Sequence, residues 1–442
     1  MSISKTIVKY SVLLFMSCLP SVAFSAESQQ VSDENQSPQS QYELSLEQAV
    51  SIATEDNPGI AEIKARADAM AAIPSQVSTL DDPVVGLNFL NFPVDTLNFG
   101  QEAMTQLQFG VSQKIPFPGK LELRGKIADY EAEATRNNID EIRLLISRDV
   151  KSLWWNLFYL DKSLQILTTN LELLRQFVQI AQTKYKVAQG LQQDVLLAQL
   201  ELSKLLEKEI EINRVKRTEV ARINTLMNRS TETPIEISHK ARIELPEILP
   251  ESQLFELARI SRPVLASQQS LIKAAQTRYE LAKKDRLPDF NIGAYYGIRG
   301  SSDSVSSRTD LMTIRLSMNI PLFADRKQYK KIDQRNSELL SSEYKLQDDK
   351  GRVELQITSA VIDYQQARDQ VSLFESGIIP LAQQTVASML AGYQVNKVDF
   401  LNLVRAQITS YDYETRYWRA LSEANSALAK LVAAVGEETI YE

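Results

Sequence analysis

Residues 107–120, "LQFGVSQKIPFPGK", combine two signals that decide the fold. Up to Ile115, apolar and polar side chains alternate with the exception of Gln113, which predicts a strand with one apolar and one polar face. Two prolines follow, and the chain between Gly125 and Gly190 contains neither glycine nor proline. Such a run of helix-forming residues predicts one very long helix. The segment therefore predicts a short two-faced strand that leads directly into a long helix.

The composition excludes several classes of function. The 442 residues are 44% apolar and 24% charged, as in an ordinary ordered protein, but histidine and cysteine each occur once. The sequence contains no metalloprotease, P-loop or nucleophile-elbow motif, and one His with one Cys is too few for the usual zinc or thiol sites. The net charge of −7 and the lack of a basic, aromatic-interleaved patch argue against nucleic acid. We therefore expect no enzyme, no cofactor and no metal site.

The N-terminus has the pattern of a secretory signal peptide at residues 1–25, with Lys5 and Lys9 beside a short apolar core. Residues 26–41 are polar and low in complexity, which predicts a flexible leader. Cleavage would remove two lysines, change the net charge from −7 to −9, and leave a mature chain without cysteine. Acylation of Cys18, as in a lipoprotein, stays open as an alternative. No other segment approaches the roughly 18 to 20 unbroken apolar residues of a membrane helix.

The opening stretch occurs twice. Residues 312–325, "MTIRLSMNIPLFAD", repeat the alternation, and Ile320-Pro321 matches Ile115-Pro116 at an offset of 205 residues. Further along, "YKVAQGLQQDVLLAQL" pairs with "YQVNKVDFLNLVRAQI" at an offset of 208. The chain is therefore predicted to contain two copies of one unit. We place the copies at residues 42–228 and 252–437, with a proline-bearing connector at 229–251 and a C-terminal tail at 438–442.

Each copy contains two predicted strands, at about 83–92 and 105–115 in the first copy and about 288–298 and 311–320 in the second. The strands run about nine or ten residues, the length at which a tilted strand crosses a bilayer. Each pair is joined by a connection of about a dozen residues, longer than a tight hairpin turn, as exposed loops on one side of a membrane tend to be. The apolar faces of the two pairs coincide at the offset of 205. We expect this face to meet lipid through Leu87, Phe109, Ile292, Ile314 and Leu316.

The helical segments carry a coiled-coil pattern. Over residues 139–188 the apolar positions step by three and four, which is the pattern of a coiled-coil seam of about seven heptads. The helix that carries this seam is expected to begin at about Lys126. A second seam runs over about 328–393, and Gly377 and Pro380 are expected to kink it.

Both long helices end at short breaks, 188–191 and 395–398, and return as helices near 192–228 and 399–435. Strands of membrane length must close into a barrel, because lipid cannot satisfy an open sheet edge. Four strands cannot close, so several chains must each contribute a sector, and three chains would give twelve strands. The predicted fold is mainly α with a membrane β-barrel sector. It is a duplicated helix-strand-strand-helix unit whose trimer forms a 12-stranded barrel, continued by a long α-helical coiled-coil duct.

The sequence resembles the TolC family of trimeric outer-membrane efflux proteins over the whole mature chain. The resemblance rests on the duplicated unit, the prolines that open the strand pairs, the Ile-Pro exits, and the paired "Y-x-V…A-Q" hairpins that begin at Tyr185 and Tyr393. It implies a passive homotrimeric duct in the cell outer membrane, with its helical part in the periplasm. Such a duct works with a periplasmic membrane-fusion adaptor and an inner-membrane RND-type pump in a tripartite efflux system.

The resemblance leaves the cargo open. The join "IPFPGKLELRG" looks more similar to the CzcC-like branch, which serves pumps that export heavy metals, so heavy-metal cations are one expected cargo. A drug or protein (type I) secretion duct of the same fold is an alternative. A periplasmic coiled-coil adaptor is another.

In the TolC family the periplasmic helix tips form a closed gate and dock the adaptor. Matched by position, Asp194 and Tyr393 keep the residue types of the family gate, whereas Val398 stands where the family has arginine. Asn402 and Arg405 stand at the acidic ring positions, and Asp399 and Lys397 lie close enough to substitute for the missing charges. The resemblance thus implies a gate at Asp194, Tyr393, Val398, Asp399, Asn402 and Arg405. The adaptor is expected to dock on the tips, at Gly190, Leu191, Val395 and Lys397.

Overall fold

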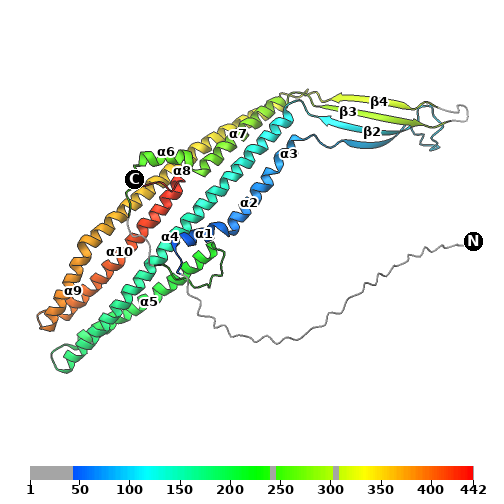
Figure 1. Ribbon diagram of the computed structural model, residues 1–442. Helices are drawn as coiled ribbons and strands as arrows, with labels where there is room; N and C mark the ends of the chain where they lie inside the picture. Colours follow the sequence, from blue (N-terminus) through cyan, green and yellow to red (C-terminus); the bar gives the residue numbers. More distant parts are fainter. Residues whose placement is uncertain (1–42, 239–244, 302–307, 442) are drawn as a thin grey trace, which may run out of the picture. The chain divides into compact units, whose positions relative to one another are not determined.

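The computed structural model describes residues 43–238, 245–301 and 308–441 of the chain. The predicted signal peptide, the leader and Cys18 lie outside these residues, as does part of the connector. Within Glu43–Glu442, which forms one compact unit, helices and strands follow each other twice in the same order (Figure 1). The structure thus contains the duplicated helix-strand-strand-helix unit.

The elements of the first copy are α1 (Leu46–Glu55), α2 (Pro58–Ala71), α3 (Ile73–Ser78), β1 (Val84–Leu90), β2 (Gln106–Ile115), α4 (Lys120–Lys186) and α5 (Gln192–Leu226). The elements of the second copy are α6 (Glu251–Ser261), α7 (Pro263–Lys284), β3 (Phe290–Arg299), β4 (Leu311–Met318), α8 (Gln328–Leu373), the π-helix η1 (Phe374–Ile378), α9 (Ile379–Gln394) and α10 (Phe400–Val435). In the described ranges, no helix has an apolar stretch of membrane-spanning length.

Local sequence explains where the short helices begin and end. Ser45 and Gln48 form a reciprocal capping box at the start of α1, and the Asn57 side chain accepts the Gly59 N–H at the start of α2. In the first copy a break at Ala72, one residue after α2, separates α2 from α3, whereas the equivalent stretch of the second copy is the single helix α7. The difference follows from Pro74, which is tolerated only in the first turn of a helix.

Helix α4 begins at Lys120, several residues before the predicted start at Lys126. The prediction was wrong because it treated Gly125 as a helix boundary. Gly125 lies inside α4, where a Cβ atom would come within 3.0 Å of the Ser78 Cβ atom on α3. The glycine is therefore explained by the close approach of two helices, and the helix breaker is Gly119, which has a positive φ of 84°. The resulting helix has 67 residues, a length of about 100 Å.

The four strands form one antiparallel sheet in the order β1-β2-β3-β4. The two copies meet at its centre, where β2 and β3 pair from Gln106 with Arg299 to Ile115 with Phe290. Strands β1 and β4 are the outer strands of this sheet.

The helices of the two copies pack against one another. Helix α4 contacts α5, α7 and α10, and α8 contacts α7 and α10. Trp154, Trp155 and Phe158 of α4 are buried, and the Phe158 ring meets the Trp418 ring of α10 with 5.9 Å between centroids. Trp154 also donates its Nε1–H to the Leu44 carbonyl at 2.9 Å. The two tryptophans are therefore packing residues between the copies.

The second copy contains one extra residue in its long helix. The π-helix η1 lies between α8 and α9, where the sequence predicts a kink, and it includes Gly377. A π-turn accommodates an inserted residue, and Pro380, which has no N–H, follows in the first turn of α9. Before η1 the buried residues of the two helices correspond at an offset of 207, and after it the sequences match at 208, as Tyr185 does with Tyr393. The buried residues Val150, Trp154 and Leu157 correspond to the buried residues Ile357, Val361 and Tyr364.

Candidate functional site

The sheet has one continuous apolar face. Because opposed residues of an antiparallel pair point to the same side, the register puts Leu87, Phe109, Tyr296 and Met312 in one row across the four strands. The next rows on this face are also apolar except at Gln113. The face thus contains all five residues predicted to meet lipid, Leu87, Phe109, Ile292, Ile314 and Leu316, and each is exposed.

The opposite face of the sheet is mostly small and polar, and its larger apolar or aromatic residues are Val84, Leu90, Tyr295 and Leu311. Its other residues include glycines, amides and hydroxyls, together with the cations Lys114, Arg299 and Arg315. The two faces therefore differ as the two sides of a membrane sheet with a watery interior would.

A buried lysine ties the helices to the sheet. Lys120, the last residue of the opening stretch, is 2% exposed, and its Nζ lies 2.8 Å from Asp289 Oδ1 and 2.9 Å from the Leu287 carbonyl. Asp289 also accepts the Phe117 N–H at 2.9 Å. Burial acts to raise the pKa of Asp289, but the hydrogen bonds from Lys120 and Phe117 and the lysine charge hold it below its usual value. The exit from β2 is thereby fixed to the entry into β3.

The far ends of the long helices are two similar turns. Ala188 and Asn396 both have positive φ, 55° and 59°, at equivalent positions of the two copies. In each turn a backbone N–H reaches back to a helix carbonyl at 2.8 Å, from Gln189 to Lys184 and from Lys397 to Gly392. The sheet and these tips therefore lie at opposite ends of α4.

One lysine joins the two tips. Lys184 Nζ donates to the Tyr393 carbonyl at 2.7 Å and to Asn396 Oδ1 at 2.6 Å, and lies 4.1 Å from the centre of the Tyr393 ring. Lys184 was not among the predicted gate residues. No sequence signal marked it, because the equivalent residue of the second copy is Gly392.

Tyr393 lies in the core of the tips. It is 5% exposed, its ring is 5.2 Å from the Phe400 ring, and within the described residues its hydroxyl has no hydrogen-bond partner. Burial raises the pKa of Tyr393, and the charge of Asp194 adds to the effect. Asp194 is half-buried and lies close enough to affect Tyr393 electrostatically, so the structure brings these two predicted gate residues together.

The other predicted gate residues differ in their surroundings. Val398 is half-buried against Gly392, where an added Cβ atom would lie 2.6 Å from its Cγ2 atom. Asp399 begins α10, but its side chain makes no capping hydrogen bond. Asn402 and Arg405 are exposed on α10. Asp399, Asn402 and Arg405 are all exposed, so within one chain they do not join the Tyr393 cluster, which consists of Lys184, Asp194, Tyr393 and Phe400.

The predicted docking residues lie around the two turns. Leu191 and Val395 are apolar and exposed, 59% and 63%, and Lys397 is also exposed. Gly190 is half-buried beside Lys184. Nowhere in the described chain do three or more His, Cys, Asp or Glu side chains gather as a metal site.

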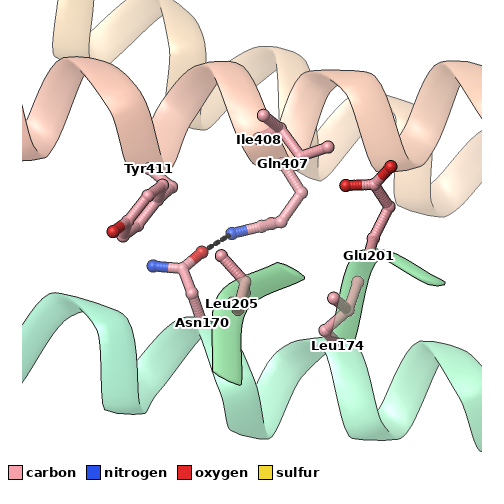
Figure 2. A pocket seen from close by; sticks show the side chains of 7 residues that line it. All are labelled: Asn170, Leu174, Glu201, Leu205, Gln407, Ile408 and Tyr411. Atoms are coloured by element: carbon pink, nitrogen blue, oxygen red, sulfur yellow. Dashed lines mark hydrogen bonds between the residues drawn. The ribbon is translucent and has the colours of Figure 1, made fainter. Parts of the chain in front are cut away.

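Between tips and sheet, the two copies are joined by a buried pair of amides. Figure 2 shows Asn170 of α4 and Gln407 of α10 pointing toward each other, and Gln407 Nε2 donates to Asn170 Oδ1 at 2.6 Å. Asn170 also donates to the Ile166 carbonyl at 2.8 Å. Leu174, Leu205 and Tyr411 surround the pair. We expect this polar pair to favour the observed register of α4 and α10, because a shift would break the hydrogen bond between the two amides.

Comparison with known proteins assigns the second copy to a family. Residues 254–437 match the family described as "Outer membrane efflux protein". This range is almost the whole of the second copy as the sequence analysis bounds it. The prediction of an outer-membrane efflux protein, rather than an enzyme, is confirmed by this match. Among curated proteins, none matches the sequence.

Solved structures extend the similarity to most of the chain. The outer-membrane channel OprN has a TM-score of 0.75 at 16% identity, with 88% of this chain and 89% of that chain covered. The outer membrane protein VceC of Vibrio cholerae has a TM-score of 0.73 at 15% identity, covering 89% and 96%. The open state of the outer membrane channel MtrE of Neisseria gonorrhoeae has a TM-score of 0.74 at 15% identity, covering 89% and 89%. The predicted fold of the chain, mainly α with a β-sheet sector and a duplicated helix-strand-strand-helix unit, is thereby confirmed.

Proposed function

We propose that this protein is the outer-membrane duct of a tripartite efflux system. It forms a homotrimer, crosses the outer membrane through its sheet, and extends its helices into the periplasm. The observation that carries the proposal is the four-stranded sheet, which is apolar on one face and polar on the other and has β1 and β4 as its outer strands.

The duplication indicates how β1 and β4 are paired. Strands β2 and β3 join the two copies inside one chain, so β4 is expected to pair with β1 of the next chain in the same way. The offset of 205 residues relates β2 to β4 and β1 to β3. If β4 and the next chain's β1 pair in the β2–β3 register, Leu87 lies opposite Met318 and Phe89 opposite Leu316. These pairs keep the apolar side chains on one face. Lipid requires such pairing, because unpaired strand edges are not tolerated there.

The helices support the same assembly. Inside one chain α10 packs against α4, and the equivalent helices, α5 and α8, have large exposed apolar residues. Ile210 of α5 is 73% exposed and is equivalent to Trp418, while Ile362 of α8 is 55% exposed and is equivalent to the buried Trp155. The next chain would cover both residues, as Trp155 and Trp418 are covered within one chain.

The duct itself is passive, and transport is driven by its partners. We propose that the tips around Leu191 and Val395 meet a periplasmic adaptor, which connects the duct to an inner-membrane RND-type pump. Exposed apolar residues at the end of two long helical hairpins suit a helical partner. The gate is proposed to lie in the same region, at the Tyr393 cluster and at Val398, Asp399, Asn402 and Arg405.

The proposal is tested by the mass of the purified protein. The signal-cleaved chain in mild detergent should have the mass of three chains, because a closed barrel needs more strands than one chain holds. A stable monomer in detergent would contradict the proposal. Recovery in the outer-membrane fraction, with resistance to extraction by salt, separates a duct from a periplasmic coiled-coil adaptor.

A further inference from the structure

Tyr295 and Arg315 form a built arrangement on the polar face of the sheet. Tyr295 of β3 lies directly opposite Gly110 of β2, and Arg315 of β4 lies directly opposite Gly293 of β3. The guanidinium carbon of Arg315 lies 4.9 Å from the centre of the Tyr295 ring. This is the distance of a cation–π contact, which orients a guanidinium without neutralising it.

Two glycines make this arrangement possible. A Cβ atom at Gly110 would lie 2.0 Å from Tyr295 Cδ1, and one at Gly293 would lie 2.9 Å from Tyr295 Cε2. The tyrosine ring therefore covers the backbone of both strands in space that any other residue would fill. The ring is a platform for Arg315, and both glycines are required for it.

The charge of Arg315 is not balanced nearby. The four strands contain no Asp or Glu, and within the described residues Arg315 forms no ion pair. The acids at the strand ends are already engaged, Asp289 by Lys120 and Asp310 by the Tyr296 hydroxyl at 2.6 Å. Lys114 and Arg299 add further positive charge toward the two ends of the same face.

We propose that Arg315, supported by Tyr295, is an anion-selecting residue of the duct. The inference rests on the proposed trimer, in which three Arg315 side chains form a ring around the interior of the sheet. Rings of Arg or Lys select anions in pores, and guanidinium groups pair well with oxyanions. The cargo class is therefore an anion that carries a carboxylate, sulfonate or phosphate group. Free heavy-metal cations would be repelled by this ring.

The experiment measures the local charge inside the sheet. Ser317 lies two residues from Arg315 on the same face, so Ser317→Cys places one thiol there in a mature chain without other cysteines. Purified trimers would be treated with sulfonatoethyl methanethiosulfonate, an anion, and trimethylammonium-ethyl methanethiosulfonate, a cation. The anion-to-cation ratio of reaction rates should fall about threefold or more when Arg315→Gln is added, and the effect should shrink at high salt.

Three further variants sharpen the result. Arg315→Lys should retain the ratio, because the charge remains. Tyr295→Leu should lower it in part, because the guanidinium loses its platform. Arg352→Gln on α8 makes the same charge change away from the sheet and should leave the ratio unchanged.

An unchanged ratio in Arg315→Gln trimers would overturn the proposal, and so would an equal fall in Arg352→Gln. Failure to form trimers would instead count against the proposed function, and it is detected separately by mass.

Discussion

At the scale of single residues, the buried contacts of Lys120 explain why residues 107–120 end in a lysine. The residue belongs to α4, but its ammonium group serves the strand junctions by pairing with Asp289 and the Leu287 carbonyl. Removing one partner of a buried charge pair costs more than the pair contributes, because the remaining charge is left without compensation.

We expect Lys120→Met to destabilise the folded protein by about 1 to 3 kcal/mol, less than for a fully buried pair because Asp289 keeps partial access to water. The pKa of Asp289 is lowered in the folded state, so its contribution is present above the unfolded-state pKa and is lost as pH falls through the folded-state pKa. The deficit of Lys120→Met should therefore be largest near neutral pH and shrink in acid. Thermal unfolding at several pH values measures it. Lys126→Met, which removes an exposed partner of Glu122, is the control and should change little.

A second prediction at this scale concerns Lys184. Because its ammonium group binds the Tyr393 carbonyl and Asn396, Lys184→Met should loosen the contact between the two tips of one chain. We expect a higher mean conductance of trimers in planar bilayers, with Lys184→Arg close to wild type. Lys186→Met, an exposed change in the same helical turn, should conduct as wild type does. Equal conductance in Lys184→Met and wild type would show that the closed state does not depend on this contact.

At the scale of elements, the two copies have diverged at identifiable points. Pro74 divides the helix of the first copy that remains continuous in the second, and η1 adds one residue to the long helix of the second copy. The polar contacts of the two copies differ too. Lys184 corresponds to Gly392, and the position that corresponds to Asn170 lies within η1. The equivalent contact between chains is therefore expected to be more apolar than the contact within a chain.

The apolar character of the contact between chains can be tested at Ile210. Ile210→Asp should prevent stable trimers, because it places a carboxylate where the next chain is expected to cover an apolar side chain. Lys208→Asp introduces the same group two residues away on another side of α5 and should leave trimers intact. Sedimentation in detergent distinguishes the two. Trimers of normal stability from Ile210→Asp would exclude this helix face from the interface.

At the scale of the whole molecule, the two faces of the sheet predict opposite responses to the same substitution. Ile314→Arg places a charge on the apolar face and should cost about 2 to 4 kcal/mol near the middle of the membrane. Ser317→Arg places it on the polar face and should be tolerated. The temperature at which trimers dissociate on a gel measures both. Equal losses in the two variants would reject the assignment of the faces.

Much of this architecture could be predicted from local sequence patterns. Alternation over residues 107–115 predicts a strand with two different faces, and the steps of three and four over 139–188 predict a long helix, because both patterns follow from backbone periodicity. The repeat of both patterns at nearly constant offset predicts the duplicated unit. The start of α4 was predicted wrongly, since a glycine required by a neighbouring helix cannot be distinguished from one that ends a helix.

The sequence by itself thus determined the elements, their order, their duplication and the apolar face of the sheet. Only the tertiary structure decided which side chains meet across the two copies: Lys120 with Asp289, Asn170 with Gln407, Lys184 with Tyr393, and Arg315 with Tyr295. The physical reason is that periodicity is a property of neighbouring residues in the chain. These contacts instead join residues of different strands, of different helices or of the turns beside them, where strand register and helix packing set the distances.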